Sequence, residues 1–394
     1  MEKPNNLETW LSRIEFHPEI IKLGLERIRP VAERLGLTTF SCPVVMVAGT
    51  NGKGTVVNLL SEIYFQSGYR VGAYTSPHLW SFNERIQVQR TPVSDGDLCQ
   101  AFTVIEDARE EIPLTYFEFT TLAALWHFQQ AKLDVLVLEI GLGGRLDAVN
   151  IVDHDLAVVT SIGLDHQSYL GETRDAIAIE KAGILRAGKP VVIGDPNPPK
   201  TLIKKANALA DPVLLYGRDF DDAPLKSLSL VQSNLACVWE VVKQLQSRVP
   251  VSLSTVLPSL KHFSVPGRCE IVCRDPLIIR DVSHNADSFQ NLANFLNALP
   301  TPKRRRAVFS CYRDKLTPTL LSPLLPLIDE WHIAPLAETR GASIDELTSL
   351  FGHHPHVSYP DIPTAFDVAK QASQPDDQLI VLGSFAVVGI IDPI

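Results

Sequence analysis

The sequence lacks any long apolar run. No segment reaches the roughly 18 uncharged apolar residues that a membrane-spanning helix requires, and residues 1–8 contain no apolar signal core. We therefore expect a protein of the cytoplasm that has no membrane partner.

Cysteine is also scarce. Six cysteines are scattered over 394 residues, without a CxxC pair and without a Cys/His cluster at zinc spacing. This pattern argues against a small fold held by disulfides and against a structural zinc site. We expect all six thiols to be reduced.

Basic residues are fewer than acidic ones. The chain has 36 Lys+Arg against 45 Asp+Glu, a formal net charge of −9, which argues against a dedicated nucleic-acid-binding protein. The one basic run, residues 303–306, directly precedes an apolar stretch. We interpret this run as a solvated entrance to a strand rather than as a phosphate-binding patch.

Short apolar runs rich in β-formers alternate with longer stretches of helical period, which is typical of α/β folds with a mostly parallel sheet. In the first part of the chain we expect strands at residues 43–48, 70–74, 133–140, 156–161 and 190–193, and helices at 55–67, 97–111 and 119–131.

The alternation is interrupted by an irregular stretch at residues 249–265 and restarts after Pro266. Further elements are expected at 276–282, 286–299, 306–311, 331–335, 343–350, 364–372 and 378–385. We therefore expect an α/β protein with an N-terminal P-loop nucleotide-binding domain over residues 1–266 and a smaller C-terminal α/β domain over residues 267–394.

A glycine-rich loop with the sequence GTNGKGT, residues 49–55, lies between the first expected strand and the first expected helix. Its glycines allow successive backbone N–H groups to point at phosphate oxygens, Lys53 adds a mobile positive charge, and Thr55 adds a hydroxyl. The loop departs from the GxxxxGK[ST] pattern at Val47 and Gly54. A tight turn without a ligand is the alternative interpretation.

Four further polar residues follow expected strands. Glu139 ends a strand and could supply an oxygen ligand to Mg²⁺, or it could be an acid that faces solvent. His166 and Lys181 would each be structural or solvated if they stood alone. Together they lie at or just beyond the carboxyl end of a strand, where ligands collect in open α/β sheets. Asp281 could bond a ribose hydroxyl, or cap the helix that follows Asn285.

The ordered set of motifs resembles one family over nearly the whole chain. The chain looks like the bifunctional dihydrofolate synthase/folylpolyglutamate synthase branch of the ATP-dependent Mur ligases. The motifs, in order, are GTNGKGT, TSPHL (75–79), EIGLGGRLDAVN (139–150), SIGLDH (161–166), EKAGI (180–184), PGR (266–268) and DVSHN (281–285).

The resemblance implies the residues of a nucleotide and metal site in a cleft between the two domains. It assigns Lys53, Lys181 and His284 to catalysis, Lys181 as a carbamylated lysine, and Ser76, Glu139 and His166 to two magnesium ions. The residues implied to contact ATP are Gly52, Lys53, Gly54, Thr55, Asn234, Arg268 and Asp281.

The resemblance also implies a pterin site. Its residues come from three segments: Lys22, Leu23 and Gly24; Thr115, Tyr116, Phe117 and Glu118; and Leu146, Asp147 and Ala148. Phe117 could stack on a flat ring.

The activity implied by the resemblance is addition of L-glutamate to dihydropteroate and to tetrahydrofolate and its polyglutamates. ATP would activate the acid as an acyl phosphate, and closure of the second domain would exclude water. We expect a monomer. The alternatives are a folylpolyglutamate synthase only, a Mur ligase acting on a UDP-sugar peptide, and an inactive folate- or nucleotide-binding protein.

Overall fold

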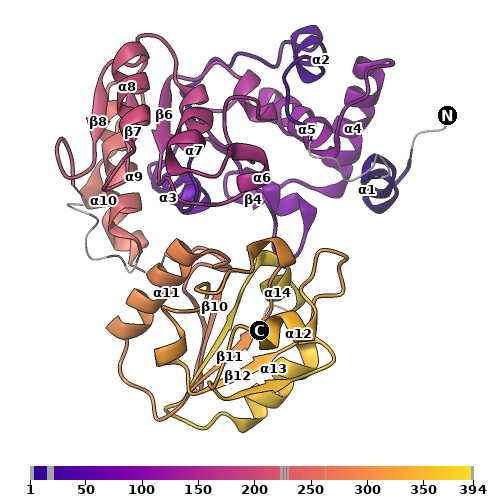
Figure 1. Ribbon diagram of the computed structural model, residues 1–394. Coiled ribbons are helices and arrows are strands. Elements are labelled where there is room, and N and C mark those ends of the chain that lie inside the picture. Colours follow the sequence, from indigo (N-terminus) through magenta and orange to yellow (C-terminus); the bar gives the residue numbers. More distant parts are fainter. Residues whose placement is uncertain are drawn as a thin grey trace. The chain divides into compact units, whose positions relative to one another are not determined.

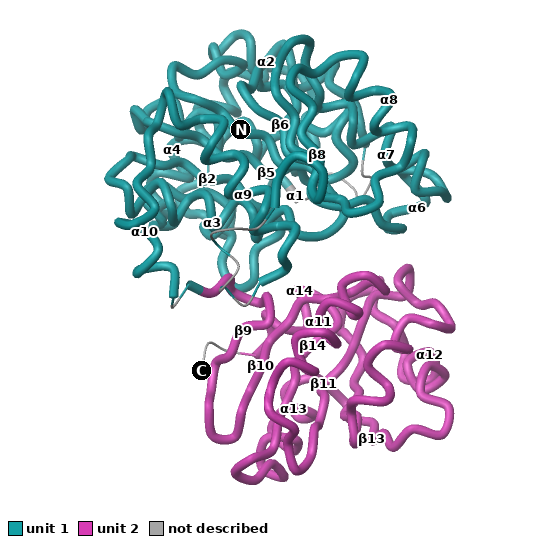
Figure 2. Tube along the Cα trace, turned by 90° about the vertical axis from the view of Figure 1, so that its left-hand side faces the viewer, with its two compact units in different colours: residues 1–263 teal, residues 264–394 magenta. Residues whose placement is uncertain are grey.

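The chain divides into two compact units. The computed structural model describes residues 4–15, 22–221, 225, 228, 230–261 and 263–391. Unit 1 ends at Phe263 and unit 2 begins at Ser264 (Figure 2), close to the expected boundary at Pro266. Each unit contains one sheet.

The sheet of unit 1 has eight strands in the order β4-β3-β2-β5-β1-β6-β7-β8. Strands β2, β5, β1, β6, β7 and β8 are parallel, whereas β3 and β4 pair antiparallel at one edge. The strands are β1 (Val44–Ala48), β2 (Val71–Tyr74), β3 (Ile86–Val88), β4 (Thr91–Pro92), β5 (Val135–Glu139), β6 (Leu156–Val159), β7 (Val191–Ile193) and β8 (Val213–Leu215).

Helices cover both faces of this sheet (Figure 1). Alternate residues of β1 therefore belong to different cores: Met46 packs with residues of α4 and α5, and Val45 packs with residues of α3, α9 and α10. This explains why the strand is apolar throughout. The helices are α1 (Leu7–Glu15), α2 (Ile28–Arg34), α3 (Lys53–Gln66), α4 (Asp95–Arg109), α5 (Tyr116–Gln130), α6 (Gln167–Leu170), α7 (Arg174–Lys181), α8 (Lys200–Leu209), α9 (Gln232–Gln244) and α10 (Leu253–Leu260), with short 3-10 turns η1 (Phe82–Arg85), η2 (Ala148–Ile151) and η3 (Ala182–Ile184).

Unit 2 has a six-stranded sheet in the order β13-β12-β11-β14-β10-β9, in which β9 alone is antiparallel. Its core contains Phe309, Trp331 and Phe351, whose rings pack against one another. The elements are β9 (Glu270–Arg274), β10 (Leu277–Asp281), α11 (Ala286–Ala298), β11 (Arg305–Phe309), η4 (Arg313–Lys315), η5 (Leu325–Leu327), β12 (Glu330–Ile333), α12 (Ile344–Thr348), β13 (His356–Ser358), α13 (Ile362–Ala372), β14 (Gln378–Leu382) and α14 (Phe385–Ile390).

The expected α/β class with mostly parallel sheets is confirmed, and two local interpretations are wrong. Residues 249–265 are not irregular, because α10 forms there despite Pro258 and packs Val256 and Leu260 into the core. The basic run is not fully solvated. Arg305 and Arg306 are 6% and 5% exposed inside β11, and Arg306 forms ion pairs. Among the described residues, no helix is long and apolar enough to cross a membrane.

Candidate functional site

The glycine-rich loop GTNGKGT, residues 49–55, connects β1 to α3. Gly49 and Gly52 have φ angles of 153° and 89°, a region of backbone conformation that favours glycine. A Cβ on Gly49 would collide with the Thr160 hydroxyl, and a Cβ on Gly52 would collide with the side-chain amide of Asn234. Both glycines are therefore needed for close packing. The lack of a side chain at Gly52 leaves room for Asn234, one of the residues that the resemblance assigns to ATP, directly beside the loop.

The segment after β6 holds this loop in place. The Thr160 hydroxyl donates to the carbonyl of Asn51 at 2.6 Å, and the backbone N–H of Thr50 donates to the carbonyl of Ser161 at 2.7 Å. The N–H of Gly163 donates to the Thr50 hydroxyl at 2.9 Å. The GTNGKGT and SIGLDH motifs thus form one hydrogen-bonded unit at the carboxyl ends of β1 and β6.

Two lysines converge on one carbonyl of the loop. Lys53, the first residue of α3, donates from Nζ to the carbonyl oxygens of Gly49 at 3.1 Å and Thr50 at 3.3 Å. Lys181, the last residue of α7, donates from Nζ to the same Gly49 oxygen at 2.9 Å. The structure therefore brings together the two lysines that the sequence assigns to catalysis.

The ammonium group of Lys181 is strongly perturbed. Its side chain is 4% exposed, and burial, followed by the positive charge of Lys53, lowers its pKa to about 7. The charges of Asp165 and Asp147 partly oppose this shift in pKa. The amine of Lys181 is consequently neutral in a large fraction of molecules near pH 7.

Glu139, Ser76 and His166 are the residues assigned to metal binding. Glu139 ends β5 and is 4% exposed. Its Oε2 accepts the N–H of Ser76 at 3.3 Å, and a Cβ on Gly54 would lie 3.5 Å from the same oxygen. His166 precedes α6, with its side chain 38% exposed and its N–H bonded to Asp165.

Two of these three residues are thus side by side next to the start of α3. No group of three or more His, Cys, Asp or Glu with metal-binding geometry occurs among the described residues. Glu139 and Ser76 offer oxygen atoms, which Mg²⁺ prefers, and Mg²⁺ usually takes only one or two protein carboxylates together with substrate phosphates. The donor set therefore fits a magnesium–nucleotide better than a closed protein metal site.

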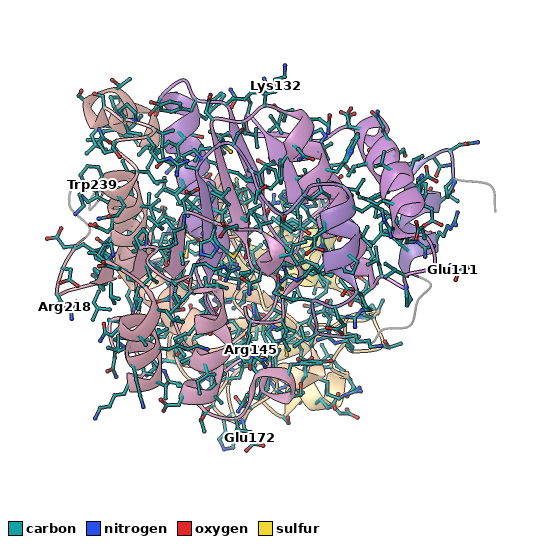
Figure 3. The ribbon with its side chains drawn as sticks, turned by 90° about the horizontal axis from the view of Figure 1, so that it is seen from above. Glu111, Lys132, Arg145, Glu172, Arg218 and Trp239 are labelled. Atoms are coloured by element: carbon teal, nitrogen blue, oxygen red, sulfur yellow. The ribbon has the colours of Figure 1, made fainter. Side chains whose placement is uncertain are left out.

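The glycines of the EIGLGGRLDAVN segment allow it to pack against α7 and η3. The backbone N–H of Arg145 donates to the carbonyl of Glu180 at 2.9 Å, and the two side chains form an ion pair at 2.9 Å. The side chain of Arg145, labelled in Figure 3, is 49% exposed. A Cβ on Gly144 or Gly183 would collide with the partner segment. This packing fixes Lys181 relative to the segment that carries Asp147.

The three segments assigned to the pterin also meet. The N–H of Gly24 donates to the carbonyl of Leu146 at 3.2 Å. Arg27 links the segment 115–118 to the segment 22–24. Its guanidinium donates to the carbonyl of exposed Lys22 at 2.6 Å and pairs with Glu118 at 2.9 Å.

Glu118 is 3% exposed and is engaged by the protein itself. Besides pairing with Arg27, its carboxylate accepts the N–H of Thr115 at 2.7 Å, and the Thr115 hydroxyl accepts the N–H of Glu118 at 3.2 Å. This capping box begins α5. The geometry assigns Glu118 to holding the segments together. Sequence reasoning missed Arg27, although it lies only three residues after Gly24.

The remaining residues of the pterin set differ in exposure. Leu23, Tyr116 and Phe117 are half-buried, and Ala148 is buried at the start of η2. The ring of Phe117 lies so close to Gly141 that a Cβ there would collide with it. Phe117 therefore lies beside the EIGLGGRLDAVN segment with part of its ring exposed.

Asp147 is the second perturbed group of unit 1. Its side chain is 2% exposed, and burial raises its pKa to about 6. The backbone N–H groups of Leu142 and Val149, which donate to its carboxylate at 2.8 and 2.9 Å, and the charge of Lys53 oppose this shift. The pKa of Lys181 is thus lowered and the pKa of Asp147 is raised. Strongly shifted pKa values of this kind are common in functional sites.

In unit 2, Arg268, Asp281 and His284 surround the turn after β10. The carboxylate of Asp281, 4% exposed, accepts the N–H groups of Cys269 at 2.7 Å and Ser283 at 2.9 Å. Nδ1 of His284 lies 2.8 Å from the carbonyl oxygen of Val282. The guanidinium of Arg268 lies 5.3 Å from the ring centre of Phe385. Asp281 does not cap α11, since Asn285 does so.

Comparison with known proteins gives the same assignment over both units. The model of the Mur ligase middle domain matches residues 47–252, and the model of the Mur ligase glutamate ligase domain matches residues 267–385. The chain is 40% identical over 399 residues to the dihydrofolate synthase/folylpolyglutamate synthase of Escherichia coli (strain K12), covering 97% of this chain and 94% of that protein.

Solved structures are similarly close. The E. coli FolC structure in complex with DHPP and ADP has a TM-score of 0.93 and 38% identity, covering 99% of this chain and 98% of that one. The bifunctional folylpolyglutamate synthase/dihydrofolate synthase of Yersinia pestis, complexed with AMPPNP and Mn ion, has a TM-score of 0.92 and 39% identity, with coverage of 99% and 98%. The resemblance inferred from the motifs is confirmed, and the chain belongs to the dihydrofolate synthase/folylpolyglutamate synthase family of ATP-dependent Mur ligases.

Proposed function

We propose that the protein joins L-glutamate to dihydropteroate and to tetrahydrofolate or its polyglutamates, with release of ADP and phosphate. The observation that carries this proposal is the convergence of Lys53 and Lys181 on the Gly49 carbonyl, inside a glycine loop that lies next to Glu139. A loop of this kind binds phosphates. The identity of the two other substrates, the folate-type acid and the amine of L-glutamate, is inferred from the family to which the chain belongs.

The chemistry explains why ATP is needed. A carboxylate has no good leaving group, so its oxygen first attacks the γ-phosphorus and ADP departs, which leaves an acyl phosphate. The neutral α-amine of glutamate then attacks the carbonyl carbon, phosphate leaves with that oxygen, and the nitrogen loses a proton. Lys53 would stabilise the charge on the transferring phosphoryl group, together with Gly52, Gly54 and Thr55.

We propose that Ser76, Glu139 and His166 hold the magnesium ions of this reaction. Bound magnesium neutralises charge on the phosphate oxygens. Glu139 is buried beside Gly54, so its carboxylate would be kept close to the nucleotide phosphates. Loss of this carboxylate should therefore raise the Mg²⁺ concentration that the reaction needs.

We also propose that Lys181 becomes carbamylated. Its neutral amine, favoured by a pKa of about 7, can attack CO₂ and lose a proton to give an N-carboxylate. The product replaces a buried cation next to Lys53 by an anion, which relieves the repulsion between the two ammonium groups. Intact-protein mass spectrometry in bicarbonate, with Lys181→Met as control, tests this step.

The pterin would be held by the three segments that meet around Gly24, with Phe117 and Asp147 as the direct contacts and with Glu118 holding the segments through Arg27. Three further roles stay predictions: ATP binding by Asn234, Arg268 and Asp281, catalysis by His284, and a monomeric state.

The test is ADP release with dihydropteroate and with tetrahydrofolate, each with and without L-glutamate, together with incorporation of labelled glutamate. Glutamate-dependent ADP release with both acids is the expected result. Activity with tetrahydrofolate alone would restrict the protein to polyglutamate extension. Binding of ATP without turnover of either acid would contradict the proposal.

A further inference from the structure

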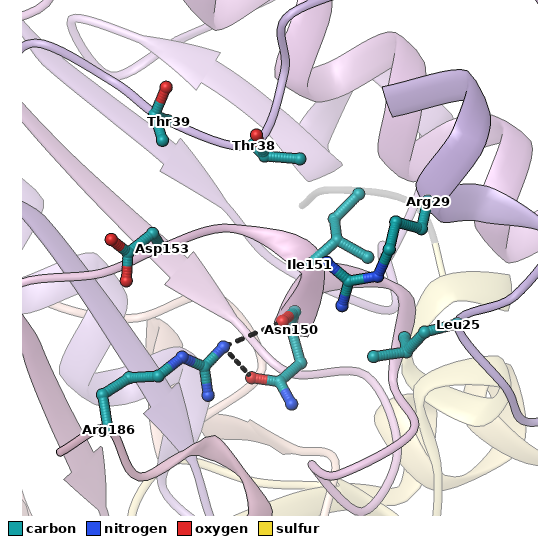
Figure 4. A pocket seen from close by; sticks show the side chains of 8 residues that line it. All are labelled: Leu25, Arg29, Thr38, Thr39, Asn150, Ile151, Asp153 and Arg186. Carbon is teal, nitrogen blue, oxygen red and sulfur yellow. Dashed lines mark hydrogen bonds between the residues drawn. The ribbon is translucent and has the colours of Figure 1, made fainter. Parts of the chain in front are cut away.

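A hollow of about 420 Å³ lies on unit 1 and is lined by none of the residues assigned above to ATP, metal or pterin (Figure 4). Its walls come from α2, from Thr38 and Thr39 before β1, from η2, and from Arg186 after η3. The volume is in the range of small-molecule sites.

Arg186 forms one side of the hollow and is held in a fixed position. Its Nη2 donates to the backbone carbonyl of Asn150 at 3.0 Å and to the Asn150 side-chain oxygen at 2.9 Å, and its Nη1 donates to the carbonyl of Ile184 at 3.0 Å. These neutral acceptors orient the guanidinium without forming an ion pair with it. A pre-oriented guanidinium is well suited to bind an oxyanion.

Arg29 points into the hollow from the opposite side (Figure 4). Among the described residues, neither Arg29 nor Arg186 forms an ion pair with a carboxylate. Burial lowers the pKa of Arg186, the charge of Asp153 raises it, and the charge of Arg29 lowers it again. Two guanidinium groups thus repel each other across one hollow, an arrangement that an anion between them would stabilise.

The rest of the wall restricts the kind of anion. Thr38 and Thr39 can offer hydroxyl donors, and Leu25 and Ile151 provide an apolar side. The carboxylate of Asp153 also faces the hollow, so a dianionic phosphate would be repelled more than a monoanionic carboxylate. The planar carboxylate also matches the fork of donors on a guanidinium.

We propose that this hollow is a binding site for a small organic acid, whose carboxylate is held by Arg29 and Arg186 and whose apolar body packs against Leu25 and Ile151. The site is separate from the phosphate loop. It requires neither ATP nor turnover, so it can be tested independently of the proposed ligase activity.

Calorimetric titration of the full chain with benzoate tests the proposal. We expect saturable binding of benzoate, weaker binding of phenyl phosphate, and no binding of benzyl alcohol, which has the same ring without the charge. Arg29→Ala should weaken benzoate binding about tenfold or more, Arg29→Lys should restore part of it, and Asp153→Asn should strengthen it.

Two controls separate this site from others. Lys261→Ala removes one exposed positive charge after α10, which packs on the opposite face of the sheet from α2, and should leave binding unchanged. Equal binding of benzoate to wild type and Arg29→Ala would overturn the proposal. So would equal binding of benzyl alcohol, or loss of benzoate binding in Lys53→Ala with retention in Arg29→Ala, which would locate benzoate at the phosphate loop.

Discussion

Both units bury charged side chains at one edge of a parallel sheet, but they surround these charges differently. In unit 2, the amino ends of β11, β12 and β14 bring Arg306 within 2.8 Å of Asp377 and 3.2 Å of Glu330. In unit 1, at the carboxyl ends of β1 and β6, the buried ammonium of Lys181 donates to a backbone carbonyl and has Lys53 as a neighbour.

The difference distinguishes a structural cluster from the cluster that we propose to be functional. A buried ion pair whose members satisfy each other keeps both groups charged and leaves little for a ligand to bind. A buried amine without an acidic partner at contact distance has a lowered pKa and gains stabilisation from an added anion. The following predictions test this distinction, from the largest expected effect to the smallest.

Lys53→Ala should reduce ADP formation by at least about 100-fold, because it removes the charge that we propose to stabilise the transferring phosphoryl group. The half-buried side chain makes its hydrogen bonds to backbone carbonyls of the loop, so the variant should fold. Coupled ADP release and circular dichroism measure the two effects, with Lys261→Ala as the matched loss of charge. Near-normal turnover would remove Lys53 from the site.

Arg306→Met should lower the free energy of unfolding by about 3 kcal/mol, because it leaves the buried carboxylate of Asp377 without its partner. Lys303→Met is the matched control. Its ion pair with Asp376 is exposed, with side chains 73% and 71% accessible, and should contribute less than about 1 kcal/mol. Urea denaturation measures both, and equal effects of the two variants would show that the buried cluster is not structural.

The stability of the wild-type protein should rise with pH above about pH 7. The folded pKa of Lys181, about 7, is below the ordinary lysine pKa of 10.5, so the unfolded chain binds more protons between these two pH values. Between pH 7 and 8.5 the free energy of unfolding should rise by about 1–2 kcal/mol relative to Lys181→Met. Equal pH dependence of wild type and variant, measured without bicarbonate, would contradict the lowered pKa.

Thr115→Ala and Ser343→Ala should each lower the free energy of unfolding by about 1 kcal/mol, because both residues begin a capping box. The two hydroxyls accept the third N–H of their helices at 3.2 and 3.3 Å. Thr115 belongs to the segment assigned to the pterin, so Thr115→Ala alone should also raise the KM for dihydropteroate. If both variants change this KM equally, the assignment of that segment fails.

The sequence was sufficient to predict the parallel core of each unit. Strands such as β1 and β5 are continuous apolar runs because helices cover both faces, and GTNGKGT marks the turn between β1 and α3. Local patterns gave less information at the edges. The hairpin β3–β4 and strand β9 are short or half-exposed, and α10 contains Pro258, which normally argues against a helix.

The site could be predicted only where one segment carries the information. Contacts between distant segments were not predictable from the residues themselves. Asn234 beside Gly52 and Arg27 paired with Glu118 depend on tertiary packing. The burial of Arg306 was missed for the same reason, because its partners Glu330 and Asp377 are far along the chain.

The central claim is that the acid is activated by phosphoryl transfer at the loop that carries Lys53. Dihydropteroate labelled with ¹⁸O in both carboxylate oxygens tests this claim most directly, because the oxygen that attacks phosphorus must leave with the phosphate. After turnover with ATP and L-glutamate, mass spectrometry should find one labelled oxygen in each inorganic phosphate released. Phosphate without label, formed together with the amide product, would contradict the account.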